Sequence, residues 1–152
     1  MKKNINNWLS EYNKYYKNKI NKLIHWICVP AIMLSLFGLL STLNFNIGNY
    51  QANVLNIFVI FSLLFYLRLS ISLTIGMLII SIIFIYLINN INHLLNNSIY
   101  YYIAIFIIAW IGQFIGHKIE GEKPAFFKDL QFLLIGPLWL LSFIYKKVNI
   151  KI

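Results

Sequence analysis

The sequence predicts an all-α integral membrane protein. It would have four transmembrane helices, an N-terminal interfacial helix, and a short C-terminal helix that is either re-entrant or a fifth span. The chain has 152 residues, of which 60% are hydrophobic and 11% charged, and its mean hydropathy is +0.71. Several apolar runs approach the roughly 20 residues that cross a bilayer as a helix. These runs are apolar on every face and do not alternate as barrel strands do, so helices that satisfy their own backbone are favoured.

Residues 1–152 are expected to form a single membrane domain, with an interfacial amphipathic segment at 1–20 and a helical bundle at 21–152. Within residues 2–19, apolar and aromatic side chains recur at helical spacing, which is typical of a helix lying in the membrane interface. These side chains are Ile5, Trp8, Leu9, Tyr12, Tyr15 and Tyr16.

The first span is expected at residues 23–43, followed by a polar stretch, 44–53, without Lys or Arg. The next apolar run, 54–88, is too long for one span and contains one charge, Arg68. We therefore predict two helices folded about Arg68-Leu69-Ser70 as a tight hairpin.

A second polar loop, 89–98, again has no Lys or Arg, and the fourth span is expected at 99–116. The last apolar run, 132–145, is short and interrupted by Gly136-Pro137. Proline removes a helical hydrogen bond, so we expect this run to be re-entrant or interfacial, with a fifth span as the alternative.

Basic residues indicate the orientation of the chain. They precede the first span, occupy the predicted hairpin and follow the fourth span, whereas the two loops between these sites have none. Since cytoplasmic loops carry the excess of Lys and Arg, the N-terminus is expected in the cytoplasm, and a bacterial inner membrane is the expected location. The net charge of +9 then indicates anionic lipid headgroups as partners, and nucleic acid is not expected. The oligomeric state does not follow from the sequence.

This orientation places His25 and His117 at the same membrane surface. Glu120 follows His117 by three residues, and Asn21 precedes His25 by four, so each pair shares a helix face. Two imidazoles and one carboxylate with open positions form the metal-binding set of non-haem Fe(II) oxygenases. His25, His117 and Glu120 are therefore candidate ligands. The alternative is that these groups simply mark the headgroup level.

Other polar residues could support such a site. Asn21, Gln113 or Glu122 could orient the histidine rings by hydrogen bonds. Gly112 and Gly116 form a small-xxx-small pair that predicts close helix packing beneath the site. Trp110 is expected in an interfacial aromatic belt.

Two long motifs resemble a known family. The segments Asn21-Lys-Leu-Ile-His25-Trp-Ile-Cys-Val-Pro30 and Trp110-Ile-Gly-Gln-Phe-Ile-Gly-His117-Lys-Ile-Glu120-Gly-Glu-Lys-Pro124-Ala125 are similar to small membrane proteins related to the fungal 2-hydroxy fatty acid dioxygenase. The resemblance implies an Fe(II)-dependent enzyme of fatty acid α-oxidation, which uses O₂ to shorten a 2-hydroxy fatty acid by one carbon. It implies that His25 and His117 bind iron, with His93 as a weaker candidate.

One departure from the family pattern concerns Tyr16. The family carries His-x-Asn-Pro-x-Asn before the first span, and here the stretch is Tyr16-Lys-Asn18-Lys19-Ile-Asn21. Tyr16 thus occupies a histidine position, and it remains a candidate catalytic residue together with Glu120 and Asn21. The alternative function is a non-catalytic or degenerate member that acts as a structural membrane protein. A transporter ranks last, because the spans offer few polar groups at mid-depth.

Overall fold

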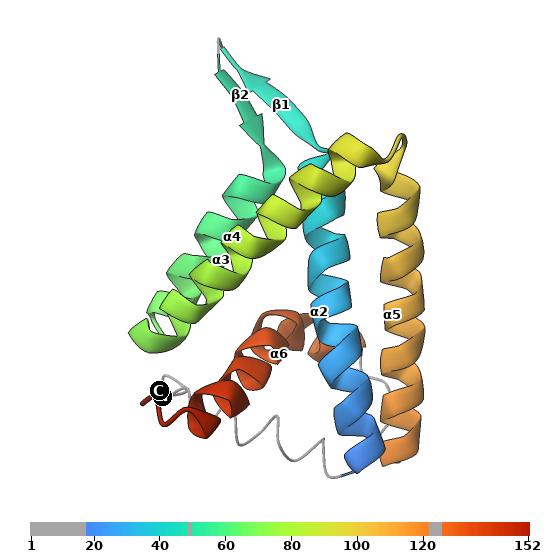
Figure 1. The fold of residues 1–152 in the computed structure, drawn as a ribbon, viewed down its shortest axis with the longest axis vertical. Coiled ribbons are helices and arrows are strands. Elements are labelled where there is room, and N and C mark those ends of the chain that lie inside the picture. The colour runs from blue at the N-terminus through green and yellow to red at the C-terminus, as the bar shows by residue number, and fades with distance from the viewer. Residues whose placement is uncertain (1–17, 49, 122–125) are drawn as a thin grey trace.

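The computed structural model describes residues 18–48, 50–121 and 126–152, so the predicted interfacial segment lies almost entirely outside the described residues. The described part is mainly helical (Figure 1). Its elements are α2 (Lys19–Ser41), β1 (Asn44–Ile47), β2 (Tyr50–Asn53), α3 (Val54–Leu67), α4 (Ile71–Leu94), α5 (Ser98–Glu120) and α6 (Phe126–Lys147).

Helices α2 and α5 run side by side in opposite directions, so the start of α2 lies beside the end of α5 (Figure 1). Glycines allow this approach. A Cβ on Gly112 would lie 2.6 Å from Sγ of Cys28, and one on Gly116 would collide with Oδ1 of Asn21. The prediction that Gly112 and Gly116 permit close packing is confirmed.

Helices α3 and α4 form the predicted hairpin. Helix α3 ends at Leu67, and Ser70 caps the start of α4 by accepting a hydrogen bond from the backbone N–H of Leu73 at 3.3 Å. The prediction for the end of α4 is wrong, because the helix continues through the expected loop to Leu94. Its last turns keep their polar side chains exposed, and Asn90 donates a hydrogen bond to the carbonyl of Tyr86, so polarity there does not break the helix.

The polar stretch expected to be a loop at 44–53 instead forms an antiparallel β-hairpin. Asn44 pairs with Asn53 and Ile47 with Tyr50, and Gly48 adopts a positive φ of 60° at the turn. A Gly-Asn pair between two short segments is a recognised hairpin signal, and it could have predicted this turn.

Helix α6 lies across the lower part of the bundle in Figure 1, and the C-terminus is at the same end as the start of α2. The expected interruption at Pro137 is wrong, because one helix runs through this residue. Its middle is deeply buried, with Leu138 and Trp139 at no more than 1% exposure. Tyr66 anchors this helix by donating a hydrogen bond from its hydroxyl to the carbonyl of Leu134 at 3.0 Å.

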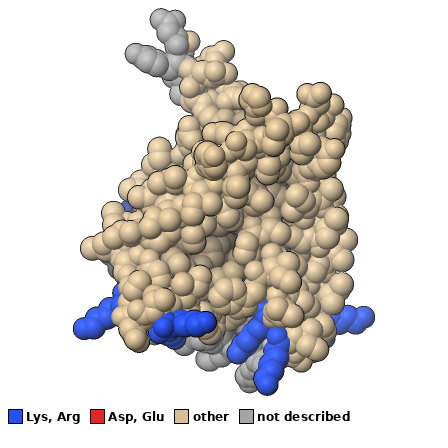
Figure 2. All heavy atoms as spheres, in the orientation of Figure 1, with Lys and Arg blue, Asp and Glu red and all other residues tan. Residues whose placement is uncertain are grey.

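Among the described residues, α2, α4 and α5 are long and apolar enough to cross a membrane, whereas α3 has 14 residues. On the face shown in Figure 2, Lys and Arg side chains gather at the lower end. That end contains the start of α2 and the end of α5, as Figure 1 shows. Basic side chains gathered at one end are the arrangement that the sequence predicted for one membrane surface.

Candidate functional site

The two histidines singled out in the sequence meet in the structure. His25 from the first turns of α2 and His117 from the last turns of α5 have ring centroids 5.5 Å apart, with planes inclined by 83°. Both side chains are buried, at 1% and 7% exposure. The antiparallel pairing of α2 with α5 brings them together, although they are far apart in the sequence.

The hydrogen bond at Nδ1 defines the chemistry of the His25 ring. Nδ1 lies 3.0 Å from the backbone carbonyl of Asn21, one turn earlier in α2. Because a carbonyl only accepts, Nδ1 carries the proton and donates. In the neutral ring the lone pair is then on Nε2, a buried atom. Metal-binding histidines commonly donate a hydrogen bond from one ring nitrogen and coordinate the ion through the other.

Glu120 joins the end of α5 to the start of α2. Its two carboxylate oxygens accept hydrogen bonds from the backbone N–H of Asn18 at 3.2 and 3.1 Å. Oε2 also accepts from Nδ2 of Asn21 at 2.9 Å. Asn18 is the N-cap of α2, so the carboxylate lies where the helix dipole favours negative charge. These bonds fix the end of α2 that carries His25 against the end of α5 that carries His117.

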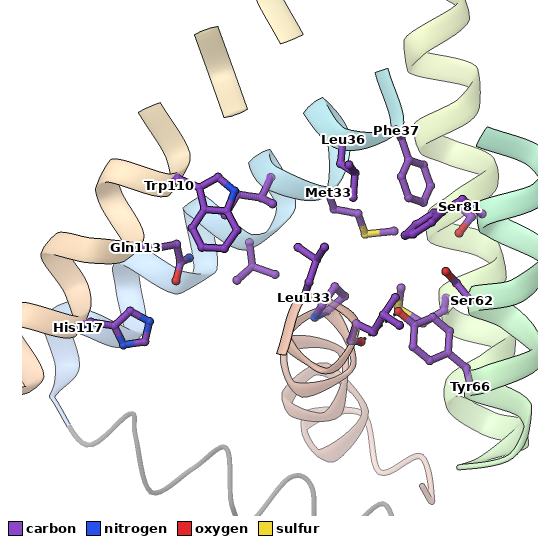
Figure 3. A pocket seen from close by; sticks show the side chains of 16 residues that line it. Met33, Leu36, Phe37, Ser62, Tyr66, Ser81, Trp110, Gln113, His117 and Leu133 are labelled. Carbon is purple, nitrogen blue, oxygen red and sulfur yellow. Dashed lines mark hydrogen bonds between the residues drawn. The ribbon is translucent and has the colours of Figure 1, made fainter. Parts of the chain in front are cut away.

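A cavity opens beside His117, the member of the histidine pair that lines it. The empty space within it is about 710 Å³, a volume that includes its open mouth. Its walls are mainly apolar side chains of α2, α3, α4 and α6, including Ile32, Met33, Leu36, Phe58 and Leu134. One side is formed by Trp110, Gln113 and His117 of α5, and the other by residues of α3 and α4 (Figure 3).

The polar residues of the cavity lie at its two sides. His117 and Gln113 line the side formed by α5, whereas Ser62, Tyr66 and Ser81 line the opposite side (Figure 3). Gln113 is 6% exposed, and its Nε2 is buried without a hydrogen-bond acceptor among the described residues. Such a donor is costly to bury and is expected to meet a partner when the cavity is filled.

The structure separates the predicted site residues into two groups. It brings together Asn21, His25, His117 and Glu120. It does not bring His93 to them, since that residue is exposed near the end of α4, at the far end of α5 from His117. Tyr16 and Glu122 lie outside the described residues.

The separation of the two rings is compatible with an ion held by two imidazoles. Two rings that bind one ion have their centres roughly 4.5–6 Å apart, because metal–nitrogen bonds are about 2.0–2.1 Å long. The observed separation of 5.5 Å lies in that range. Among the described residues, no group of three His, Cys, Asp or Glu side chains is arranged to hold a metal. The expected third ligand, Glu120, has its carboxylate at the start of α2 instead.

Gln113 and Trp110 have roles that the sequence did not predict. Both line the cavity, whereas Gln113 was expected to support the histidines and Trp110 to lie in an interfacial belt. Trp110 precedes Gln113 by three residues and Gln113 precedes His117 by four, so all three share one face of α5. This spacing is the sequence signal that could have found them.

Comparison with known proteins gives two matches over most of the chain. A family model described as "2-hydroxy-palmitic acid dioxygenase Mpo1-like" matches residues 2–148. The chain is also 30% identical over 142 residues to the 2-hydroxy-palmitic acid dioxygenase MPO1 of Saccharomyces cerevisiae, which covers 91% of this chain and 78% of the yeast protein. No solved structure matches the chain.

Proposed function

The chain belongs to the 2-hydroxy-palmitic acid dioxygenase Mpo1-like family, and from this premise we propose that it is a membrane-embedded, Fe(II)-dependent dioxygenase of 2-hydroxy fatty acids. With O₂ as the oxidant, the products would be the fatty acid one carbon shorter, CO₂ from the lost carboxyl carbon, and water. The relative's name supports the substrate class, and the site supports the chemistry.

The observation that carries this proposal is the meeting of His25 and His117 at the side of an apolar cavity. His25 would bind iron through Nε2, since its Nδ1 donates to the carbonyl of Asn21. His117 would bind the same ion from α5 while facing the cavity. Fe(II), when bound, would supply the activation of O₂ that organic side chains lack.

The cavity would hold the acyl tail of the substrate. Its apolar walls remove the tail from water, at a gain of about 0.8 kcal/mol for each buried CH₂ group. A tail lying among Met33, Leu36 and Phe37 would leave the oxidisable head at Gln113 and His117 (Figure 3). The remaining walls would exclude water from the reacting carbon.

Basic residues near the site would attract the carboxylate of the substrate. Lys22 follows Asn21 on α2, and Lys118 follows His117 on α5, so both lie at the same end of the bundle as the histidines. Their positive charge favours a fatty acid anion arriving from the membrane surface.

The proposal is tested by product analysis of the purified protein in detergent. The iron-loaded protein should convert 2-hydroxypalmitate to pentadecanoate in air and leave it unchanged under nitrogen. Palmitate, which lacks the hydroxyl group, should not be shortened. Conversion that proceeds equally without O₂, or no conversion by a protein that contains iron, would contradict the proposal.

The role of the two imidazoles is tested by iron content. His25→Ala and His117→Ala should each lower the amount of bound Fe(II) and reduce turnover by about 100-fold or more, because each substitution removes one imidazole that would bind the metal. His93→Ala is the matched control, because His93 is exposed at the opposite end of the bundle. Iron content unchanged in both His25→Ala and His117→Ala would remove the metal assignment.

A further inference from the structure

Gln113 is a buried polar residue whose amide donor, Nε2, has no acceptor among the described residues. It is 94% buried, given its exposure of 6%, and it lines the cavity one helical turn before His117. Figure 3 shows the side chain between Trp110 and His117 on the α5 side of the cavity.

An amide N–H buried without an acceptor destabilises a protein by the cost of removing it from water. A residue of similar length and no polar group, such as Met, would fill the same space without that cost. The amide lies beside His117 in a cavity whose walls are mainly apolar, which indicates that its acceptor belongs to a ligand. A carboxylate is the strongest acceptor that an amphiphilic ligand of this shape could offer.

We propose that Gln113 positions the substrate by donating a hydrogen bond from Nε2 to the carboxylate of the fatty acid head. This inference rests on the proposed function for the substrate class, but it concerns binding and does not require iron or turnover. With the tail directed toward α3 and α4, the bond would hold the head beside His117. A neutral donor does so without placing a second positive charge next to a metal site.

Two variants test the proposal in the iron-free, full-length protein, with ligand binding measured by displacement of a fluorescent fatty acid. Gln113→Met removes the donor, and Gln113→Glu places a negative charge opposite the carboxylate. Gln51→Met is the matched control, because Gln51 is exposed on β2. Three probes separate the head groups: 2-hydroxypalmitate, palmitate and 1,2-hexadecanediol, which has no carboxylate.

Gln113→Met should weaken both acids by about tenfold, the loss expected for a hydrogen bond to a charged group. Gln113→Glu should weaken them further, and the control should leave them unchanged. Affinity for the diol should change much less than affinity for the acids, because a neutral hydroxyl is a weaker acceptor than a carboxylate. Equal weakening of the diol, unchanged binding of the acids, or failure of the wild-type protein to bind 2-hydroxypalmitate would overturn the proposal.

Thermal unfolding provides a second and independent readout. Without ligand, Gln113→Met should raise the unfolding temperature, because it removes an unsatisfied donor. A structural role for Gln113 predicts a lower temperature, and that result would also overturn the proposal. If the acids bind as expected but no oxidation product is found, the dioxygenase assignment fails while the role of Gln113 stands.

Discussion

Gly116 lies on α5 where a side chain of α2 packs against the backbone beside the site. A Cβ there would collide with Oδ1 of Asn21, a fully buried residue whose Nδ2 donates a hydrogen bond to Glu120. We expect Gly116→Ala to lower the free energy of unfolding by about 1–3 kcal/mol, as overpacking does in cores. Thermal or denaturant unfolding measures this loss.

The cause can be isolated with a double-mutant cycle. In an Asn21→Ala background the colliding oxygen is gone, so adding Gly116→Ala should cost much less. An equal cost in both backgrounds would show that the destabilisation comes from elsewhere.

Glu120 gives a second prediction for a single residue. Its carboxylate accepts hydrogen bonds from the N–H of Asn18 and from the amide of Asn21, so we expect Glu120→Gln to cost about 1–2 kcal/mol of stability. We also expect iron content to stay near the wild-type level, because the carboxylate orients α2. Loss of iron from a folded Glu120→Gln protein would instead make Glu120 a ligand.

The sequence predicted the histidine pair because charge placement alone determines which helix ends share a membrane surface. His25 and His117 follow from that rule. The bond from Asn21 to Glu120 and the position of Gln113 in the cavity could not be predicted in this way. They depend on the rotation of α2 and α5 about their axes, which nearly uniform apolar faces leave undetermined.

At the scale of elements, the hairpin of α3 and α4 forms the cavity wall opposite the histidines. Ser62 and Ser81 are small residues in that wall, and both are largely buried (Figure 3). Since the tail is proposed to point toward them, a larger side chain should shorten the usable cavity. The positions of α3 and α4 were largely predictable from the sequence, because the apolar run 54–88 is too long for one span and its single charge, Arg68, indicated a turn.

Ser62→Leu should therefore lower the affinity for 2-hydroxypalmitate by about tenfold or more, the range expected for inserting extra methylenes into packed space. Binding of the shorter 2-hydroxylaurate should change little. Phe61→Leu is a suitable control, because Phe61 is 67% exposed on the same helix. Equal losses for both chain lengths would show that the tail does not reach this wall.

At the scale of the whole molecule, the start of α2 and the end of α6 lie at one end and the β-hairpin at the other (Figure 1). In a membrane, these two ends should face opposite sides. The path of α6 could not be predicted from its hydropathy, because Pro137 indicated a break and the helix instead continues into the core.

Labelling of single cysteines tests this orientation in a Cys28→Ser background. Cysteines at Lys19 and Lys147 should react with an impermeant maleimide from the cytoplasmic side, and one at Asn46 from the opposite side. All three positions lie outside the cavity and are exposed. If the cysteines at positions 19 and 147 were labelled from different sides of the membrane, α6 would have to cross it.

The central claim is that His25 and His117 bind the same iron ion. X-ray absorption spectroscopy of the Fe(II)-loaded protein measures this directly, because imidazole ligands give a characteristic multiple-scattering pattern. We predict scattering from two imidazoles on one iron in the wild-type protein and from one in His25→Ala. A wild-type spectrum without histidine scattering, or one that His25→Ala leaves unchanged, would contradict the claim.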